Sequence, residues 1–424
     1  MKIGAWKCGP DYIDTMFHSK VLGIPTGNLD RFFCDAETLQ YLITEREDKY
    51  EISIIEGVMG YFDGIGFTKN GSSAEIAACT KTPVVLVVNG AGMSRSIEAI
   101  LRGFQIMDSQ IKGVIFNQVS KMVYEEVAKI AEQLGMIPLG YIPKQKEFEL
   151  QSRHLGLVTA LEIQNFQERL NRFSDQLEKT VEIEKFLKLA EHAEKWKKRM
   201  EPEDIKAFRE KNSKPVRIAV AKDEAFCFLY EDNLELLRKL GCEIHFFSPI
   251  RSTKLPKQIG ALWLGGGYPE LYAKELSANS SMRHAVREAI QSGMPCIAEC
   301  GGFLYLHKQL EDSEHTYYPM VGVWENNGIY GERLRRFGYI TMQAKTDGLL
   351  AKKGEFLTAH EFHYWESENP GNDFHARKPG NGREWMAAYH TATYYAGFPH
   401  FYLYGNRKAA FSFVEAARKF QEGQ

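Results

Sequence analysis

Short, strongly apolar runs alternate with longer amphipathic stretches along this chain, and the alternation limits the folds open to it. Runs of about four to eight apolar residues, bounded by Gly or Pro and separated by helical patterns, predict a parallel sheet covered by helices. We therefore expect a doubly wound α/β domain in the first part of the chain. Its runs are KIGAWKCG, EISIIEG, PVVLVVNG, GVIFNQV and PLGYIP, at residues 2–9, 51–57, 83–90, 113–119 and 138–143.

A second α/β pattern begins at VRIAVAKD (216–223) and continues through EIHFFSP and ALWLGGGYPELY to PCIAECGGFLYL (295–306). From about Leu161 to the start of the second pattern the sequence lacks glycine, is highly charged and shows helical periodicity. Its basic run KWKKR has acidic residues on both sides, so we interpret it as the solvated face of a helix. The sequence predicts one domain at 1–195, a linker at 196–214 and a second domain at 215–424.

The composition excludes several kinds of partner. The net charge of -2 gives no electrostatic case for binding nucleic acid or an anionic membrane. Seven cysteines without C-x-x-C spacing indicate neither a disulfide framework nor a zinc ribbon, which fits a reducing cytoplasm. The sequence shows no secretory signal and no apolar run of membrane-spanning length. We expect a cytoplasmic protein whose partners are small molecules.

Cys300 directly follows an apolar strand pattern and precedes two glycines and a helical run, in MPCIAECGGFLYL. A cysteine at such a turn meets backbone N–H donors and the positive end of a helix, which favour the thiolate. This is the arrangement of a nucleophile elbow. The alternative is a buried structural cysteine, because cysteine is among the most buried residue types.

Two other segments favour the nucleophile. The turn in WLGGGYPELY, with Gly266 and Gly267, can offer backbone N–H groups to a developing oxyanion. His400 in GFPHFYLYGN is a candidate base for the thiol. A lone histidine would be interpreted as an ordinary core or surface residue. His400 is a candidate base only because the chain also contains a cysteine with which it can pair.

In their order, GGGYPELY, AECGGFLYL, HEFHY and GFPH resemble the C-terminal glutaminase domain of the cobyrinic acid a,c-diamide synthases, a family of class I glutamine amidotransferases. The resemblance implies that Cys300 attacks the side-chain amide of glutamine to give a γ-glutamyl thioester and ammonia. It also implies that His400 acts as acid and base, and that Gly266 and Gly267 form the oxyanion hole.

The chain departs from the family pattern at two places. Many class I amidotransferases have a glutamate two positions after the histidine, where this chain has Tyr402, so the third group of the site is left unassigned. Trp365 replaces the usual serine after HEFHY. His360, Glu361 and His363 fall one residue short of H-E-x-x-H, and their spacing gives no case for zinc.

Acidic residues gather after two strand patterns in the N-terminal half. KCGPDYIDTMFH contains Asp11, Asp14 and His18, and IIEGVMGYFDG contains Glu56 and Asp63. Carboxylates at the ends of parallel strands lie where ligands of open α/β sheets bind, and they can hold Mg²⁺ or orient a substrate. Each acid alone would be interpreted as a turn or helix-cap residue. Two clusters at strand ends favour a site.

GPDYID and EGVMGYFDG also resemble the same synthase family. The resemblance implies a P-loop NTPase-like, dethiobiotin-synthetase-like domain. Such a domain uses ATP and Mg²⁺ to convert a carboxylate of the corrinoid precursor to an acyl phosphate, which ammonia then displaces. Glu56 would be a metal ligand, and Asn117 in GVIFNQV would meet the nucleotide base. The residues that would bind ATP, Mg²⁺ or substrate are Asp11, Asp14, Glu56, Asp63 and Asn117.

One part of the family pattern has no counterpart in this sequence. Members begin with a strand, a G-x-x-x-x-G-K-[ST] phosphate loop and a helix ahead of the strand that matches KIGAWKCG, whereas no G-K-[ST] occurs in these 424 residues. Either Met1 is an internal methionine, or the first unit was lost from a fragmentary gene, or the chain is a genuine short form. We expect the given chain to bind ATP weakly and to leave KIGAWKCG and its neighbours with an unpaired sheet edge and an uncovered apolar face.

The sequence thus predicts an ATP-dependent, glutamine-hydrolysing ligase that amidates the a and c carboxylates of cobyrinic acid in cobalamin biosynthesis. Its partners would be glutamine, ATP and a corrinoid or related tetrapyrrole, and a homodimer is left open. Three alternatives remain. They are amidation of Ni-sirohydrochlorin in the coenzyme F430 pathway, a form that acts only as a glutaminase, and a non-catalytic binding protein.

Overall fold

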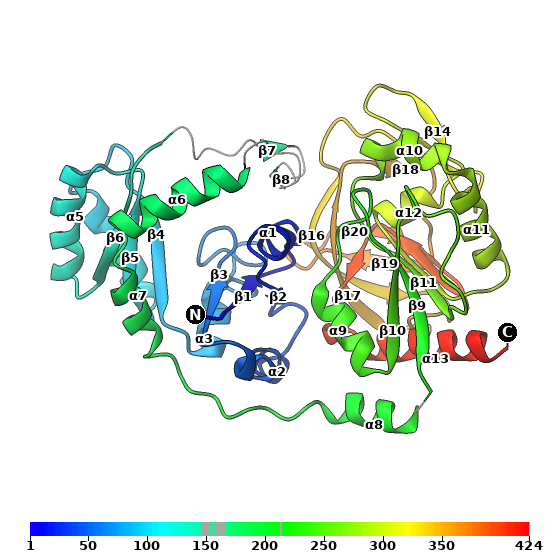
Figure 1. Ribbon diagram of the computed structural model, residues 1–424, viewed down its shortest axis with the longest axis horizontal. Helices are drawn as coiled ribbons and strands as arrows, with labels where there is room; N and C mark the ends of the chain where they lie inside the picture. Colours follow the sequence, from blue (N-terminus) through cyan, green and yellow to red (C-terminus); the bar gives the residue numbers. More distant parts are fainter. Residues whose placement is uncertain (146–151, 154–155, 158–165, 213, 424) are drawn as a thin grey trace. The chain divides into compact units, whose positions relative to one another are not determined.

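The computed structural model describes residues 1–145, 152–153, 156–157, 166–212 and 214–423, which form two compact units (Figure 1). Both units are α/β and contain parallel sheets, which confirms the predicted fold class. Unit 1 consists of Met1–Leu29, Leu39–Gly64 and Lys69–Arg199, and unit 2 of Asp30–Thr38, Ile65–Thr68 and Met200–Gln424.

Unit 1 is built on two three-stranded parallel sheets, with strand orders β2-β1-β3 and β4-β5-β6. The apolar runs of the sequence predict each of these strands except β2, whose four residues, TGNL, are too few and too polar to make a strand pattern. The strands are β1 (Ile3–Cys8), β2 (Thr26–Leu29), β3 (Ile52–Glu56), β4 (Val84–Asn89), β5 (Ile111–Asn117) and β6 (Ile137–Ile142).

Helices alternate with these strands and supply part of the core. Ile97 and Leu101 of α4 are fully buried against Val114 and Phe116 of β5. This burial explains why an amphipathic segment forms a helix here. The helices of this half are α1 (Ile13–Val21), α2 (Ala36–Glu45), α3 (Ser73–Thr80), α4 (Ile97–Met107), α5 (Lys121–Gln133), α6 (Phe166–Thr180) and α7 (Ile183–Ala190), with the 3₁₀ turn η1 (Glu47–Lys49) and the antiparallel pair β7 (Ser152–Arg153) and β8 (Gly156–Leu157).

An unpaired edge is predicted for KIGAWKCG and its neighbours, and in the structure it lies at a neighbour. Ala5 of β1 stands opposite Thr26 of β2 on one side and Ile54 of β3 on the other, so KIGAWKCG itself is central in its sheet. The short strand β2, which the pattern does not reveal, covers one side of β1 and leaves the edge at β3. Within the described residues the two sheets end at β3 and β4, where Ile54 and Val87 are 41% and 62% exposed.

The segment between α7 and α8 (Glu203–Lys211) has no regular secondary structure at residues 194–202, so KWKKR does not lie on a helix. The prediction of a solvated helix face is wrong there because Trp196 anchors the segment to unit 1. Its Nε1 donates to the carbonyl oxygen of Thr80 at 3.1 Å. Lys81 and Arg199 place their cations 5.3 and 5.6 Å from the centroid of its ring.

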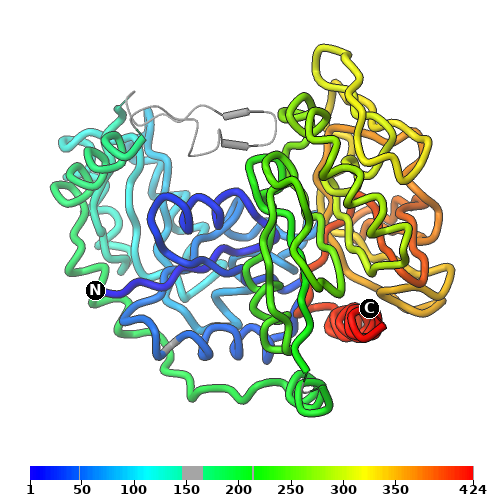
Figure 2. The backbone as a smooth tube through the Cα atoms, turned by 45° about the vertical axis from the view of Figure 1, so that its right-hand side comes forward, coloured from blue at the N-terminus to red at the C-terminus, as the bar shows by residue number. Residues whose placement is uncertain are grey.

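A six-stranded sheet of order β10-β9-β11-β12-β22-β21 forms the centre of unit 2. Its strands are parallel except β21, and α13 packs against β9 and β11 (Figure 2). The sheet contains β9 (Val216–Ala221), β10 (Cys242–Phe247), β11 (Ala261–Leu264), β12 (Cys296–Glu299), β21 (Tyr389–His390) and β22 (Tyr394–Gly397). The helices are α9 (Glu231–Lys239), α10 (Ala273–Ala278), α11 (Ser280–Gln291), α12 (Gly301–Tyr305) and α13 (Arg407–Glu422), with the 3₁₀ turns η3 (Pro269–Tyr272) and η4 (Leu403–Gly405).

Two further sheets complete unit 2. One is antiparallel, of order β20-β19-β16-β17-β23, and it places His360 of β17 opposite His400 of β23. The other is mixed, of order β14-β13-β15-β18. Their strands are β13 (Gln309–Glu311), β14 (Tyr317–Pro319), β15 (Asn327–Ile329), β16 (Arg336–Ala344), β17 (Phe356–His363), β18 (Glu366–Ser367), β19 (Phe374–Arg377), β20 (Glu384–Ala387) and β23 (His400–Phe401).

A short segment from the first part of the chain, Asp30–Thr38, belongs to unit 2. The Asp30 Oδ2 atom accepts a hydrogen bond from the Tyr339 hydroxyl at 2.8 Å, and the ring of Phe33 stacks on Tyr402 with centroids 5.7 Å apart. The segment therefore packs beside the residues that follow His400. Among the helices that the structure describes, none has the length and apolarity needed to span a membrane.

Candidate active sites

Cys300 lies between β12 and α12 with backbone angles φ 48° and ψ -101°. A positive φ is costly for a residue that has a Cβ atom, so this turn is strained, as in a nucleophile elbow. The backbone N–H of Cys300 donates to Gly397 O of β22 at 2.8 Å, and its Sγ atom lies 3.9 Å from Phe362 O of β17. The thiol is thus held at a point where three strands meet.

The glycine turn after β11 contacts both the cysteine turn and His400. A Cβ atom on Gly266 would lie 2.4 Å from His400 Cε1, so this position must be glycine to leave room for the imidazole. A Cβ atom on Gly301 would lie 3.0 Å from the backbone nitrogen of Gly267. Of the two predicted oxyanion donors, Gly267 therefore lies against the turn at Cys300, whereas Gly266 packs against the candidate base.

His400 has an acidic neighbour that the sequence pattern does not indicate. The imidazole Nδ1 lies 3.8 Å from Oε2 of Glu299, the residue that precedes Cys300. Both side chains are buried, and Glu299 Oε1 accepts a hydrogen bond from the backbone N–H of Phe401 at 2.9 Å. The family pattern directs attention to the position after the histidine, so only the fold reveals the acid beside the cysteine.

The thiol environment differs from the one expected at a helix N-terminus. Burial raises the pKa of the Cys300 thiol well above its usual value, and three nearby glutamates raise it further. The hydrogen bond with Gly301 acts in the opposite direction and is outweighed. A helix of five residues in a desolvated site does not stabilise a thiolate enough, so a nucleophilic Cys300 would need a base. The three glutamates are Glu270, Glu361 and Glu299.

The AHEFHYW segment is buried and largely neutral. Burial lowers the pKa of His360 and of His363 to about 3 and raises that of Glu361 to about 8. In the part of the chain that the structure describes, no group of three His, Cys, Asp or Glu side chains is arranged to hold a metal. Trp365 Nε1 donates to Glu311 O at 2.6 Å, so the residue that replaces the family's serine anchors the connection between β17 and β18 to β13.

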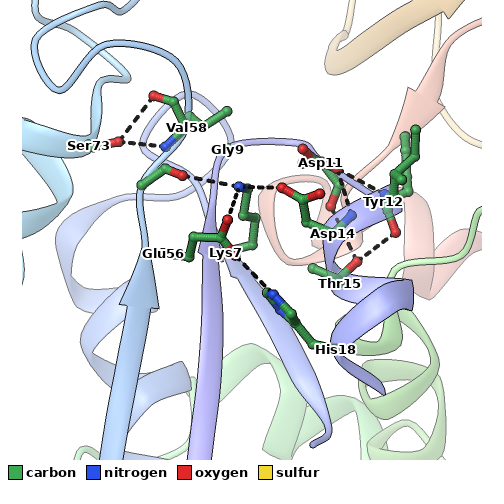
Figure 3. Close-up of polar contacts among 12 residues, drawn as sticks. Lys7, Gly9, Asp11, Tyr12, Asp14, Thr15, His18, Glu56, Val58 and Ser73 are labelled. Carbon is green, nitrogen blue, oxygen red and sulfur yellow. Dashed lines mark hydrogen bonds and ion pairs between the residues drawn. The ribbon is translucent and has the colours of Figure 1, made fainter. Parts of the chain in front are cut away.

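Lys7, which the sequence analysis does not single out, lies at the centre of a polar network in unit 1 (Figure 3). Its side chain is 4% exposed, and its Nζ atom contacts Asp14 Oδ2 at 2.5 Å and Glu56 Oε1 at 3.0 Å. Lys7 and Glu56 stand opposite each other in the β1–β3 register, so strand pairing delivers both to the same end of the sheet. A lysine inside the apolar run KIGAWKC is the signal that could have identified it.

The network keeps Lys7 and Glu56 charged. Burial lowers the pKa of Lys7, but its contacts with Asp14 and Glu56 outweigh burial and raise the pKa above its usual value. Burial raises the pKa of Glu56, but His18 and Lys7 outweigh burial and lower it. His18 Nε2 lies 3.0 Å from Glu56 Oε2. An ammonium group is thereby fixed between two carboxylates at the carboxyl end of β1, where ligands of parallel sheets bind.

Two of the predicted acids have local roles in the backbone. Asp11 Oδ1 accepts hydrogen bonds from two backbone N–H groups at the start of α1, at 2.8 and 3.1 Å, in the manner of a helix cap. Asp63 is exposed, and its Oδ2 atom accepts from Gly60 N at 3.1 Å within a turn. The structure thus joins Asp14 and Glu56 through Lys7, while Asp11 and Asp63 serve a cap and a turn.

Asn117 lies in the other sheet of unit 1. It is the last residue of β5 and stands opposite Asn89 of β4. For Mg²⁺, the network offers carboxylate oxygens of Asp14 and Glu56, both already in contact with Lys7. These residues fit a Mg²⁺ ion that takes one or two protein carboxylates and completes its shell with phosphate oxygens and water. They do not form a complete protein cage for the ion.

Comparison with known proteins places both halves of the chain in one family. Residues 217–401 match the model of the CobB/CobQ-like glutamine amidotransferase domain, and residues 33–152 match the model of an AAA domain. The first match contains both Cys300 and His400.

Three relatives are similar over most of the chain, and each is a cobyrinate a,c-diamide synthase. The protein of Caldanaerobacter subterraneus subsp. tengcongensis is 38% identical over 423 residues, which cover 98% of this chain and 92% of the relative. That of Listeria innocua is 37% identical, with 95% and 89% covered. That of Limosilactobacillus reuteri is 40% identical, with 85% and 79% covered. The protein described here therefore belongs to the cobyrinate a,c-diamide synthase family, ligases that take their nitrogen from glutamine.

Proposed function

We propose that the protein hydrolyses glutamine in unit 2 and uses the ammonia to amidate the a and c carboxylates of cobyrinic acid in an ATP-dependent step. The similar relatives named cobyrinate a,c-diamide synthase support the substrate and the reaction. The observation that carries the proposal is the strained turn at Cys300, with Gly267 against it and His400 beside the same glycine turn.

In the glutaminase reaction, Sγ of Cys300 forms a bond to the side-chain carbonyl carbon of glutamine while the thiol proton passes to His400. The backbone N–H of Gly267 donates to the oxyanion that forms. The C–N bond then breaks as His400 returns the proton to the leaving nitrogen, which releases ammonia and leaves a thioester. Water hydrolyses the thioester to glutamate. Burial keeps the thiol protonated at rest, so the thiol must lose its proton to His400 before or as the sulfur attacks.

In the amidation reaction, a carboxylate oxygen of the macrocycle attacks the γ-phosphorus of ATP and ADP leaves. Ammonia then adds to the acyl carbon and phosphate leaves. Lys7 is held by Asp14 and Glu56 where it can face the negative oxygens of the carboxylate and the phosphoryl group. Mg²⁺ held through Glu56 would neutralise charge on the transferred group. Asn117, at the end of β5, is proposed to meet the nucleotide base.

The test measures the two reactions separately in the full chain. Ammonia release reports glutamine hydrolysis, and mass spectrometry of the macrocycle with glutamine or ammonium chloride reports amidation. Cobyrinic acid and Ni-sirohydrochlorin are assayed in parallel. We expect amidated cobyrinic acid with either nitrogen source. Amidation of Ni-sirohydrochlorin alone would reassign the substrate, and a wild-type chain without glutamine hydrolysis would refute the glutaminase.

A glutaminase without the ATP-dependent step is a second candidate function. The exposed apolar residues on β3 and β4 favour it, because the sheet that carries Lys7 and Glu56 ends at β3 among the described residues. This candidate requires glutamine hydrolysis without ATP and no amidation with either nitrogen source. Titration of the chain with Mg·ATP by calorimetry separates the two, since only the first proposal requires ATP to bind.

A further inference from the structure

We propose that Glu299 is the positioning residue of the glutaminase site, which holds the imidazole of His400 from the Nδ1 side and completes a Cys-His-Glu arrangement. The inference rests on the proposed roles of Cys300 and His400. It fills the position left open by Tyr402, which stands where many class I amidotransferases have a glutamate. The acid comes instead from the end of β12, one residue before the nucleophile.

The contacts of Glu299 fix its carboxylate in place. Oε1 accepts a hydrogen bond from the backbone N–H of Phe401 at 2.9 Å, and Oε2 accepts one from Trp263 Nε1 at 3.3 Å. Oε2 is also the atom that lies 3.8 Å from His400 Nδ1. Catalytic contacts are often longer before substrate binds, so 3.8 Å is compatible with a hydrogen bond that shortens in the complex. The carboxylate is thus bound to the backbone of the residue that follows the histidine it orients.

The other buried carboxyl groups near the thiol are less suited to this role. Burial raises the pKa of Glu270 and of Glu361 to about 8, so both are neutral near pH 7. Glu361 Oε1 lies 3.9 Å from a different histidine, His363. Glu299, in contrast, accepts two N–H hydrogen bonds, which an ionised carboxylate does best.

The chemical consequence follows from the two ring nitrogens of His400. With the proton on Nδ1 directed at Glu299, Nε2 is the acceptor that can take the thiol proton of Cys300. When the imidazolium forms, the carboxylate stabilises its charge in a site from which water is excluded. Two further titratable groups near this ring are His360, opposite it on β17, and His363, and burial keeps both neutral near pH 7. Glu299 is therefore the anionic partner of the imidazolium.

The test uses Glu299→Gln in the full chain. Glutamine keeps the size of the side chain and the acceptor for the Phe401 N–H, but it removes the charge and offers an N–H₂ group that favours the wrong imidazole tautomer. We expect kcat for glutamine hydrolysis to fall by about a hundredfold or more with KM nearly unchanged, as when the acid of a triad is converted to its amide. The acid limb of the pH–rate profile should move to lower pH, because the imidazolium loses its anionic partner.

Glu311→Gln is the matched control. Glu311 is also buried, accepts a backbone N–H from Tyr330 and contacts His315 Nδ1 at 2.8 Å, but it lies on β13 in another sheet. A role that is merely structural would lower the thermal stability of both variants and leave the pH profile of the remaining activity in place. The proposal requires the pH shift in Glu299→Gln alone.

The outcomes separate this inference from the proposed function. If wild-type chain hydrolyses glutamine, Cys300→Ala and His400→Ala do not, and Glu299→Gln retains both wild-type kcat and the wild-type pH profile, Glu299 has no positioning role. If the wild-type chain does not hydrolyse glutamine at all, the proposed function fails instead. Should Glu299→Gln not fold, Glu299→Asp decides: we expect a loss of about tenfold, since the shortened carboxylate misplaces the ring. Wild-type activity in that variant would overturn the proposal.

Discussion

The pKa values of the carboxyl groups shift in opposite directions in the two candidate sites. Around Cys300, burial raises the pKa of Glu270 and of Glu361 to about 8, so these acids are neutral at pH 7. Around Lys7, ion pairing outweighs burial and holds the pKa of Glu56 below its usual value. A thiol and an amide substrate suit a desolvated, mostly neutral site, whereas anionic substrates and Mg²⁺ require fixed charges. The difference is what the proposed division of the reaction between the two units requires.

The sites also differ in how completely the described residues enclose them. Cys300 is 7% exposed and contacts Gly397 of β22 and Phe362 of β17, strands of two different sheets. The Lys7 network lies at the end of a three-stranded sheet that terminates, among the described residues, at β3 with Ile54 exposed. We therefore expect substitutions in the first site to act on glutamine hydrolysis alone, and substitutions in the second to act on amidation from any nitrogen source.

The largest effect should come from Cys300→Ala, which removes the only group in the proposed mechanism that forms a bond to glutamine. Glutamine hydrolysis should fall by about 10⁴-fold or more, while amidation driven by ammonium chloride persists. Ammonia release and macrocycle mass, measured on one preparation, check both statements. Equal loss of the two activities in a folded variant would contradict the separation of the sites.

His400→Ala should lower glutamine hydrolysis by about a hundredfold or more, the contribution expected of a general base. The thiol remains, but burial leaves it protonated, and His400 is no longer there to take its proton. Steady-state kinetics with glutamine measure the loss, and His360→Ala is the comparison because His360 lies opposite on β17. A dispensable His400 together with an essential His360 or His363 would reassign the base.

Glu56→Gln should depress amidation with both nitrogen sources by about tenfold to a hundredfold, because it removes a charge that holds Lys7 and a candidate ligand of Mg²⁺. Glutamine hydrolysis should be affected much less. Asp63→Asn is the control from the same sequence motif, since Asp63 is exposed in a turn, and its effect should be smaller. If Glu56→Gln, alone or with Asp63→Asn, amidates at the wild-type rate, neither acid belongs to the mechanism.

The smallest effect concerns stability and pH. The folded-state pKa of Glu361, about 8, exceeds the value of about 4.3 for an unfolded chain. The stability linked to the neutral carboxyl is fully present below pH 4.3 and is lost as pH rises toward 8, by about 1.4 kcal/mol per pH unit at most. Glu361→Gln should therefore gain stability relative to the wild type between pH 5 and pH 8. Urea unfolding at both pH values measures this, and a difference that does not change with pH would show that Glu361 is ionised in the fold.

Local sequence patterns predict much of what these experiments probe. Apolar runs predict β1, β3, β4, β5 and β6, because strands of a parallel sheet covered by helices are apolar along their length, although none of the residues of β3 is buried in the structure. The C-G-G after such a run predicts the strained turn at Cys300, because a strand that passes at once into a helix needs small residues beside the turn. The apolar strands and the turn at Cys300 can be predicted because each depends on residues that are consecutive in the sequence.

Contacts between distant residues are not visible in such patterns. Glu299 meets His400 through strand pairing between distant segments. Glu299 ends β12, which pairs with β22, and His400 begins β23, which pairs with β17. Lys7 meets Glu56 only through the β1–β3 register. The open edge falls at β3 because the short strand β2 takes the other side of β1.

The sequence by itself therefore determined the α/β class, the nucleophile turn and the acidic strand ends of this protein. The tertiary structure decided which acid faces the histidine, which cation holds the N-terminal carboxylates and which carboxyl groups are neutral. The physical reason is that charge state and side-chain partnership depend on burial and on strand register, which arise only when segments distant in the chain pack together.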